Sequence, residues 1–352
     1  MKRLRLLLLP FSWLYGAILF FRHFLYDRGL LNSYSFDKPV IVVGNLVLGG
    51  AGKSPMTEYL LRLLFTRVKI ATLSRGYGRK SVGYLEVKNN SLAEMVGDEP
   101  LQFKSKFPEI TVADCEDRVK GLKYLMPNHD VFILDDAFQH RRLKPGLSIL
   151  LFDFESLREN KLVLPAGNYR DLFMRRNFAD IIVVTKSPKN LSERDKQRSL
   201  QLLKLESQRS TFFAYIEYGD FMNLRTDEQQ SFPMSTQLMV VTGIANPKPF
   251  YKHLETKGNI WRTMEFPDHH RFTVNDLLKI KKYWQLQHDC LIVTTEKDAM
   301  RLKDPKLLSH LEDLPFYYMP IEMKFHTDKN GPNFDNLIIK KVLSKQNVDN
   351  TF

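Results

Sequence analysis

Cysteine is scarce in this sequence. Only Cys115 and Cys290 occur among its 352 residues, far apart and outside any Cys-x-x-Cys pair. The chain therefore lacks the cysteines for a disulfide framework or a zinc site, and we expect two reduced thiols in a cytosolic compartment. Internal repeats and long low-complexity segments are lacking too, so ordinary globular domains are expected.

The composition is that of a globular protein. Hydrophobic residues make up 43% and charged residues 26% of the chain, which is long enough for two domains with buried cores. Lys and Arg number 52 against 40 Asp and Glu, which gives a formal net charge of +12. This charge favours anionic partners such as nucleotide phosphates or phospholipid headgroups. Since no nucleic-acid recognition motif accompanies it, we expect no nucleic-acid partner.

One apolar run stands out, near the N-terminus. Residues 6–21 carry no charge, and basic residues flank them, including Lys2 and Arg5 before and Arg22 and Arg28 after. The run is short for a spanning helix of about 20 residues, and no small-x-small cleavage site follows it. We predict a membrane-associated helix within residues 1–30 that lies in the cytoplasmic leaflet, with its aromatic side chains at headgroup level. A spanning anchor and a buried helix of the soluble domain are the alternatives.

Strand and helix patterns alternate along the rest of the chain. Valine- and isoleucine-rich runs predict buried strands at 38–44, 69–74, 130–136, 147–153 and 181–185. Helical patterns occupy 57–65, 116–124 and 192–206. After a polar, turn-rich stretch the alternation restarts, with strands at 237–243 and 289–295 around a helix at 249–258. Such alternation predicts doubly wound parallel sheets.

The predicted organisation is an α/β protein in four parts. The membrane-associated helix spans 1–30, a phosphate-loop domain with a parallel sheet spans 31–216, a linker spans 217–236, and a smaller α/β domain spans 237–352. A cleft is expected between the two domains.

The sharpest motif joins a predicted strand to a predicted helix. Residues 44–55 read Gly-Asn-Leu-Val-Leu-Gly-Gly-Ala-Gly-Lys-Ser-Pro. Glycines let the backbone aim its N–H groups at phosphate oxygens, and the helix N-terminus adds its dipole, as in P-loop nucleotide-binding proteins. Lys53 would neutralise phosphates and the Ser54 hydroxyl would bind Mg²⁺. The strict pattern would have glycine at Val47, and a turn that only caps a helix is the alternative. The predicted nucleotide-binding residues here are Gly49, Gly50, Ala51, Gly52, Lys53, Ser54 and Pro55.

Carboxylates supply the second half of the expected site. Asp135 and Asp136 end a strand, as a Walker B strand does, and so face the same sheet edge as the phosphate loop. We predict that they bind Mg²⁺ with Ser54; the alternative is that one of them only caps the next turn. Asp98 precedes Pro100 at a helix start. It either caps that helix or accepts the proton of an attacking hydroxyl, and the residues alone leave both open.

In the second domain, Asp268 is followed by two adjacent histidines, His269 and His270. Adjacent histidines face apart and no third ligand is evident, so a metal site is the weaker interpretation. An Asp–His pair that tunes a catalytic group is the stronger one.

These motifs follow one another in the order found in one known family. They are Gly44-Asn45 with Gly49 to Pro55, Ser74 to Gly78, Gly97 to Pro100, Asp135 to His140, Leu164 to Gly167, Phe266 to His269 and Thr295 to Asp298. Together they resemble the tetraacyldisaccharide 4′-kinase family, the lipid A 4′-kinases, across most of the chain. No single motif is decisive, but the ordered set is specific.

The resemblance implies an enzyme of two α/β domains at the cytoplasmic face of the bacterial inner membrane. It implies transfer of phosphate from ATP, with Mg²⁺, to the 4′-hydroxyl of a tetraacylated glucosamine disaccharide 1-phosphate, the lipid A precursor. Its partners would be that lipid and the bilayer. The implied site residues are Lys53 and Ser54 on phosphate and Mg²⁺, Asp98 as general base with His269 as its partner, Asp135 and Asp136 around Mg²⁺, and Gln139 and His140 as companions at the nucleotide.

Three positions depart from the family pattern. Ser54 replaces a commoner threonine and keeps the hydroxyl, Ala137 stands where glycine is usual, and Asp171 stands where a longer glutamate is usual. The role of Asp171 is left open. The alternative function is a P-loop ATPase or GTPase that regulates a membrane partner.

Overall fold

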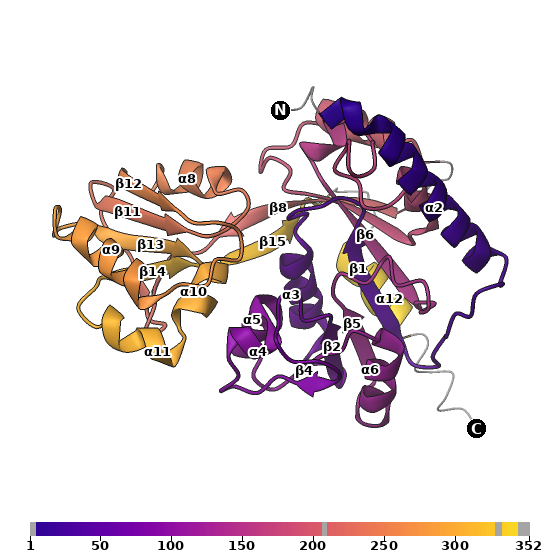
Figure 1. Ribbon diagram of the computed structural model, residues 1–352, viewed down its shortest axis with the longest axis horizontal. Helices are drawn as coiled ribbons and strands as arrows, with labels where there is room; N and C mark the ends of the chain where they lie inside the picture. Colours follow the sequence, from indigo (N-terminus) through magenta and orange to yellow (C-terminus); the bar gives the residue numbers. More distant parts are fainter. Residues whose placement is uncertain (1–4, 206–209, 328–332, 344–352) are drawn as a thin grey trace.

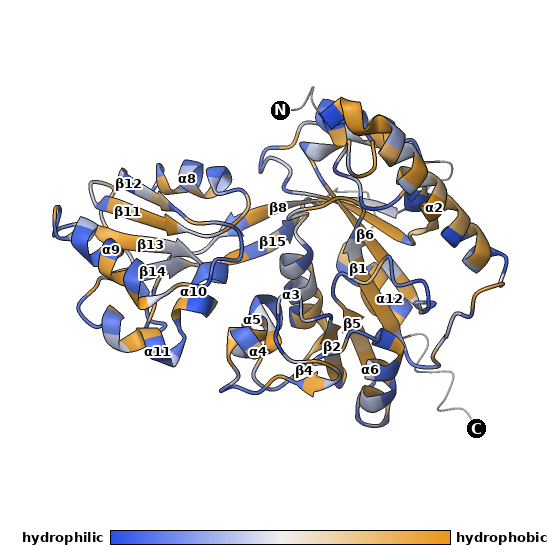
Figure 2. Cartoon of the chain, in the orientation of Figure 1, coloured by the Kyte–Doolittle hydropathy of each residue, from blue (hydrophilic) through white to orange (hydrophobic). Residues whose placement is uncertain are grey.

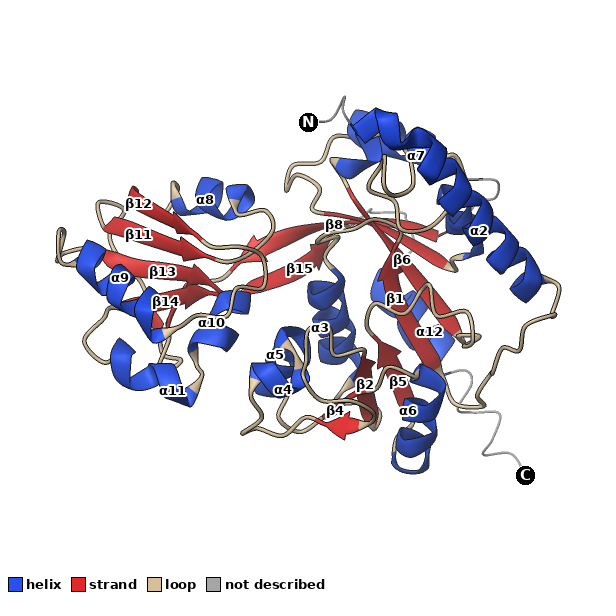
Figure 3. Ribbon diagram, in the orientation of Figure 1, coloured by secondary structure: helices blue, strands red, loops and turns tan. Residues whose placement is uncertain are grey.

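The computed structural model describes residues 5–205, 210–327 and 333–343. The basic start at Lys2 and Arg3 and the tail 344–352 lie outside the described residues. The chain forms two lobes, each a sheet with helices on both faces, joined by two long strands (Figures 1 and 3).

The first lobe is built on a nine-stranded sheet in the order β15-β8-β7-β6-β1-β5-β2-β4-β3. Neighbouring strands from β8 to β4 pair parallel, and the two edge strands pair antiparallel. The central strands are buried along their whole length, as a sheet covered on both faces requires. The strands are β1 (Val40–Asn45), β2 (Ile70–Ser74), β3 (Leu85–Glu86), β4 (Thr111–Asp114), β5 (Val131–Leu134), β6 (Leu147–Asp153), β7 (Ile181–Thr185), β8 (Ser210–Tyr218) and β15 (Ile321–Phe325).

Helices cover both faces of this sheet. Alternate side chains of β1 separate two cores: Ile41 and Val43 pack with α3, α5 and α12, whereas Val40 and Val42 pack with α6. The helices and 3₁₀ turns of this lobe are η1 (Leu6–Leu8), α2 (Leu9–Asp27), α3 (Lys53–Leu64), α4 (Ala93–Val96), α5 (Asp98–Lys106), α6 (Arg118–Leu125), η2 (Met126–Asn128), η3 (Ser156–Arg158), η4 (Phe173–Phe178), α7 (Glu193–Leu203) and α12 (Phe334–Leu343).

The second lobe has a six-stranded sheet in the order β10-β9-β14-β13-β11-β12. Helix α8 packs on one face, and α9, α10 and α11 pack on the other. The elements are β9 (Phe221–Asn223), β10 (Gln229–Gln230), β11 (Gln237–Thr242), α8 (Lys248–Leu254), β12 (Asn259–Glu265), α9 (Val274–Trp284), β13 (Leu291–Thr295), α10 (Glu296–Leu302), α11 (Pro305–Leu308), η5 (Ser309–Leu311) and β14 (Phe316–Met319).

The predicted domain boundaries are wrong at two places. The stretch 217–236 is not a separate linker, because it contains the end of β8 and both β9 and β10 of the second sheet. The domain predicted for 237–352 ends early, since β15 returns to pair with β8 and α12 packs in the first core. Pattern analysis missed this return because local periodicity does not report which sheet a strand joins.

Helix α2 lies along the outside of the first lobe, and its surface is largely apolar (Figure 2). It is the one helix of the described chain long and apolar enough to cross a membrane, which by itself is weak evidence. Ser12, Leu19 and His23 are its buried residues, whereas Phe11 and Trp13 are 62% and 70% exposed. One narrow side of α2 therefore packs on the first lobe, and the other side exposes apolar side chains.

Candidate active site

The phosphate loop lies between β1 and α3, at the carboxyl edge of the first sheet. Gly52 precedes α3 with φ of 81°, a left-handed conformation that a side chain would strain. Asn45 closes the loop by donating from Nδ2 to the Gly49 carbonyl at 3.3 Å. On the β7 side, Thr185 Oγ1 donates to the Ala51 carbonyl at 2.8 Å, and the ammonium of Lys186 binds the Gly50 carbonyl. The loop is thus fastened at both ends.

Lys53 begins α3 and points to the strand edge. Its ammonium lies 3.4 Å from Asn45 Oδ1 and 3.8 Å from Asp136 Oδ1. Ser54 and Pro55 follow in the first turn of the same helix, whose N–H groups have no partners within the helix. The predicted residues 49–55 therefore form one loop and helix start, with a lysine held beside a carboxylate.

Asp136 is clamped by an arginine from a distant loop. Arg170 Nη1 donates to Asp136 Oδ2 at 2.9 Å, and Nη2 binds both Asp136 Oδ1 and Asn45 Oδ1. Burial would raise the pKa of Asp136, but the hydrogen bonds from Arg170 and the charges of Lys53 and Arg118 outweigh it and lower that pKa. Asp136 is therefore ionised at neutral pH.

Asp135 differs from its neighbour although the two are adjacent. It is buried, and Thr57 Oγ1 lies 3.4 Å from its Oδ1. Burial, followed by the charge of Asp136, raises the pKa of Asp135 to about 7. Two adjacent carboxylates of which one is hard to ionise form a position that a cation would stabilise, since a positive ion reverses this effect.

Asp98 is the first residue of α5 and not its cap. Gly97 is the cap, with φ of 88°, and turns the chain so that the Asp98 carboxylate faces the second lobe. His269 Nδ1 lies 3.0 Å from Asp98 Oδ2, and Arg301 Nε lies 3.4 Å from the same oxygen. Burial would raise the pKa of Asp98, but the hydrogen bond from His269 and the charges of Arg301 and Lys297 lower it.

The tautomer of His269 follows from its other neighbour. Lys297 Nζ lies 3.2 Å from His269 Nε2, and an ammonium can only donate. Nε2 is therefore the acceptor, the ring proton is on Nδ1, and His269 donates to Asp98. Lys297 also pairs with Glu99 Oε1 at 2.7 Å, so a continuous row of polar contacts runs between the lobes from Asp98 through His269 and Lys297 to Glu99.

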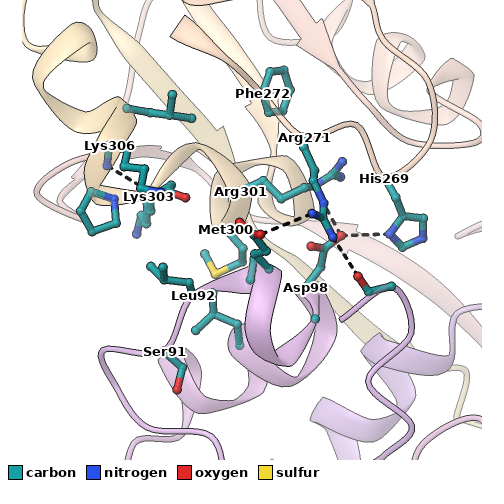
Figure 4. A pocket seen from close by; sticks show the side chains of 18 of the residues that line it. Ser91, Leu92, Asp98, His269, Arg271, Phe272, Met300, Arg301, Lys303 and Lys306 are labelled. Atoms are coloured by element: carbon teal, nitrogen blue, oxygen red, sulfur yellow. Dashed lines mark hydrogen bonds and ion pairs between the residues drawn. The ribbon is translucent and has the colours of Figure 1, made fainter. Parts of the chain in front are cut away.

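A cavity of about 600 Å³ lies beside Asp98, between the lobes (Figure 4). Asp98 and Leu92 line it from the first lobe, and His269, Arg271 and Lys306 line it from the second. Arg271 Nη2 bonds across to the Gly78 carbonyl at 2.9 Å. The cavity is lined by both acidic and basic side chains, among them Glu94 and Lys303, together with apolar ones such as Leu92.

Behind this contact, a second ionic cluster joins the lobes. Lys106 of α5 lies 2.6 Å from Glu58 Oε2 of α3 and 2.7 Å from Glu296 Oε1 of α10. Gln102 Nε2 also donates to Glu58 Oε1 at 2.6 Å. Burial, only partly offset by the charge of Lys106, raises the pKa of Glu58 to about 7. One ammonium thus holds two buried carboxylates together.

The predicted site residues fall into two groups. Lys53, Asp135 and Asp136 gather at the phosphate loop, whereas Asp98 and His269 meet across the lobes. No hydrogen bond or ion pair joins the two groups within the described residues.

Gln139 and His140 lie on the turn after β5. Gln139 Nε2 donates to the Asn45 carbonyl at 2.7 Å, which places Gln139 behind the phosphate loop. Burial, followed by the charge of Arg118, lowers the pKa of His140 to about 4, so the ring is neutral at pH 7. Its Nε2 is buried and has no hydrogen-bond partner among the described residues.

The sequence patterns missed several residues that shape these groups. Arg170 follows the Leu164 to Gly167 motif, and nothing local marks it as the partner of Asp136. Arg118 is buried near the acidic pair, yet it reads as an ordinary helix residue. Thr57 was detectable in principle, because it lies one helical turn after Lys53 and so on the same face.

Comparison with known proteins agrees with this architecture. The family model described as Tetraacyldisaccharide-1-P 4′-kinase matches residues 4–342. The Tetraacyldisaccharide 4′-kinase of Flavobacterium johnsoniae is 44% identical over 99% of this chain and 100% of its own, and that of Bacteroides thetaiotaomicron is 41% identical over 90% and 88%.

A solved structure is similar as well. The crystal structure of the "apo" form of LpxK from Aquifex aeolicus in complex with ATP superposes with a TM-score of 0.74 at 30% identity, covering 96% of this chain and 99% of that one. Fold, motif order and near-complete coverage agree, and the chain therefore belongs to the tetraacyldisaccharide 4′-kinase family.

Proposed function

We propose that this protein transfers the γ-phosphate of ATP to the 4′-hydroxyl of a tetraacylated glucosamine disaccharide 1-phosphate, the precursor of lipid A. The observation that carries the proposal is the Asp98–His269 pair, a buried carboxylate oriented by a histidine of the other lobe. Both residues line the cavity between the lobes, which has room for an acceptor much larger than the water that a regulatory ATPase or GTPase would use. The names of its relatives and the ATP bound to the Aquifex structure support the same reaction.

The phosphate-loop residues supply charge and position. Lys53 would lie on the β- and γ-phosphates, with the free N–H groups of α3 beside it. Phosphoryl transfer needs little covalent help, so neutralising the charge of the phosphates is the main contribution expected of this group.

The donor set suits Mg²⁺, which prefers oxygen ligands. Ser54 offers a hydroxyl and Asp135 a carboxylate that forms no ion pair with any described residue, whereas both oxygens of Asp136 already bind Arg170. We infer that Asp135 is the closer ligand and that Asp136 acts through Arg170 or through water. When bound, the ion would neutralise charge on the triphosphate.

Asp98 would orient the acceptor hydroxyl and take its proton. Its lowered pKa keeps it ionised at neutral pH, and His269 holds it in place by donating from Nδ1. A weak base is sufficient here, since the hydroxyl loses its proton late in a loose transition state. The lobes would exclude water from this position and so limit hydrolysis of ATP.

We also propose that the protein binds the membrane, at the cytoplasmic face of the inner membrane. The acceptor is a lipid, and α2 presents bare apolar side chains, among them Phe11, Trp13 and Leu14. We infer that this side of α2 lies in the headgroup region, which brings the lobe cleft to the lipid.

Transfer of labelled phosphate from ATP to the purified disaccharide in mixed micelles tests the reaction. We expect lipid-dependent transfer that Asp98→Asn slows by about 10²-fold while ATP binding is retained. Hydrolysis of ATP without lipid, equal in the wild type and in Asp98→Asn, would instead support the regulatory ATPase.

Co-sedimentation with vesicles that contain an anionic phospholipid tests the membrane surface. Trp13→Ser should release much of the protein from the pellet. Leu286→Ser is the matched control, because Leu286 is 67% exposed on the second lobe. Equal release by both substitutions would count against α2 as the contact.

A further inference from the structure

Helix α2 touches the first lobe through polar contacts. Ser12 Oγ donates to the Val163 carbonyl at 3.0 Å and accepts from Ala166 N at 2.9 Å. Tyr15 OH donates to the Arg170 carbonyl at 3.2 Å. An anchor that only held the protein at a membrane would need none of these bonds. The loop they reach, residues 163–171, is the loop that carries Arg170.

The strongest of these contacts is a buried pair. His23 Nε2 lies 2.7 Å from Asp171 Oδ1, and the two side chains are only 4% and 1% exposed. The same oxygen of Asp171 accepts from the Leu172 backbone N–H at 2.8 Å. Removing one partner of a buried pair leaves an unpaired polar group, so this contact strongly opposes any shift of the loop away from α2.

Arg170, next to Asp171, is held on three sides. Its backbone N–H donates to the Leu46 carbonyl at 2.9 Å in the phosphate loop, and its guanidinium binds Asp136 and Asn45. A short path thus runs from α2 to the acidic pair, through His23, Asp171, Arg170 and Asp136. Each step is a hydrogen bond or a peptide link.

A second path starts at Arg22, the residue before His23, and reaches Asn45. Arg22 Nη2 donates to the Gln139 carbonyl at 3.1 Å, and Gln139 Nε2 donates to the Asn45 carbonyl at 2.7 Å. The first path ends at Asp136 and the second at Asn45, and the Arg170 guanidinium binds both residues beside Lys53. Helix α2, which carries the exposed apolar surface, is therefore also connected by hydrogen bonds to Asn45 and Asp136 at the phosphate loop.

We propose that His23 is a positioning residue for phosphoryl transfer: through Asp171 it fixes Arg170 on Asp136, so that α2 sets the geometry of the acidic pair as well as contacting lipid. This inference rests on the proposed function. It assigns Asp171 the role of fastening its loop to α2, which the sequence left open. Asp171, shorter than a glutamate, reaches a histidine that approaches to within 2.7 Å.

The test compares His23→Gln, His23→Leu and Asp171→Asn in micelles that saturate the enzyme with lipid. We expect kcat to fall about 10–100-fold, as is typical when a group that orients a metal ligand is removed. The Mg²⁺ concentration for half-maximal rate should rise, and the KM for the lipid should stay unchanged. His23→Gln/Asp171→Asn should be no worse than either single variant, because both remove one interaction.

A second readout does not depend on catalysis. Amide hydrogen exchange of the segment 163–172 should accelerate in His23→Gln without lipid, nucleotide or Mg²⁺. The segment around Asp136 should accelerate with it, since Arg170 connects the two. His288→Gln is the matched control, an exposed histidine of the second lobe, and should change neither exchange nor kcat. Thermal melting reports whether each variant folds.

Some results would overturn the inference and leave the kinase proposal intact. They are wild-type kcat and Mg²⁺ dependence in His23→Gln and His23→Leu, or a loss of rate that only tracks the folded fraction. If the wild type transfers no phosphate to the disaccharide, the proposed function fails instead. Exchange at 163–172 and around Asp136 then still decides whether α2 holds the acidic pair in place.

Discussion

The two groups of the candidate site are assembled in different ways. Lys53, Asp136 and Arg170 come from one lobe and meet at one edge of its sheet, where hydrogen bonds within that lobe hold them. Asp98 and His269 come from different lobes and meet only because the lobes contact each other through α5 and α10. The phosphate-loop group is thus built on a single sheet, whereas the Asp98–His269 pair depends on the relative position of two lobes.

Substituting the lysine should have the largest effect and should separate the groups most clearly. Lys53→Ala removes the ammonium at the phosphate loop, so both ATP affinity and kcat should fall, the latter by about 10³-fold. Radiolabel transfer and equilibrium binding of ATP measure the two. A variant with full activity would mean that triphosphate does not bind at this loop.

Substituting the base should affect one group and spare the other. Asp98→Asn should lower kcat by about 10²-fold, the lower end for a general base, because little proton transfer is needed early. The dissociation constant for ATP should be unchanged. Weakened ATP binding in this variant would show that the two groups are not independent.

Substituting the histidine should have a smaller effect with a distinctive pH dependence. His269→Gln should lower kcat/KM about tenfold at neutral pH. His269 lowers the pKa of Asp98, so its removal raises that pKa toward the ordinary range. Because the base must be ionised, activity is lost as pH falls through this pKa, and the acidic limb of the profile should move to higher pH. An acidic limb at the wild-type pH would mean that His269 does not act on the pKa of the base.

The cluster behind the site should affect the pH dependence of stability. The pKa of Glu58 is raised from 4.5 to about 7, so the folded protein holds a proton that the unfolded chain releases between these values. That contribution is complete below pH 4.5 and is lost as pH rises to about 7, at no more than about 1.4 kcal/mol per pH unit.

Thermal melting between pH 5 and 7.5 measures this contribution. Glu58→Gln should have a flatter dependence of Tm on pH than the wild type. Identical slopes would mean that Glu58 does not carry the proton.

The sequence predicted the local parts of this molecule well. The strands around β1, the loop 44–55 and the family are confirmed, since each rests on residues that are contiguous or ordered in the chain. It did not predict Arg170 on Asp136 or His23 on Asp171, because partners 34 and 148 residues apart leave no periodic signal. The return of β15 was missed for the same reason. The roles of Asp98 and His269 stay predictions, although the structure brings them together.

The route of the chain through β8 and β15 has a consequence for how the molecule is put together. Gly219 N donates to the Pro320 carbonyl at 2.9 Å, so the chain leaves the first lobe and re-enters it at almost one point. The second lobe is thus a domain inserted between β8 and β15, two paired strands of the first lobe. Replacing residues 220–319 with a short turn would keep every strand of the first lobe's sheet in one continuous chain. The shortened protein would retain the phosphate loop but lose His269, which contacts Asp98. We therefore expect it to bind nucleotide without transferring phosphate to an acceptor.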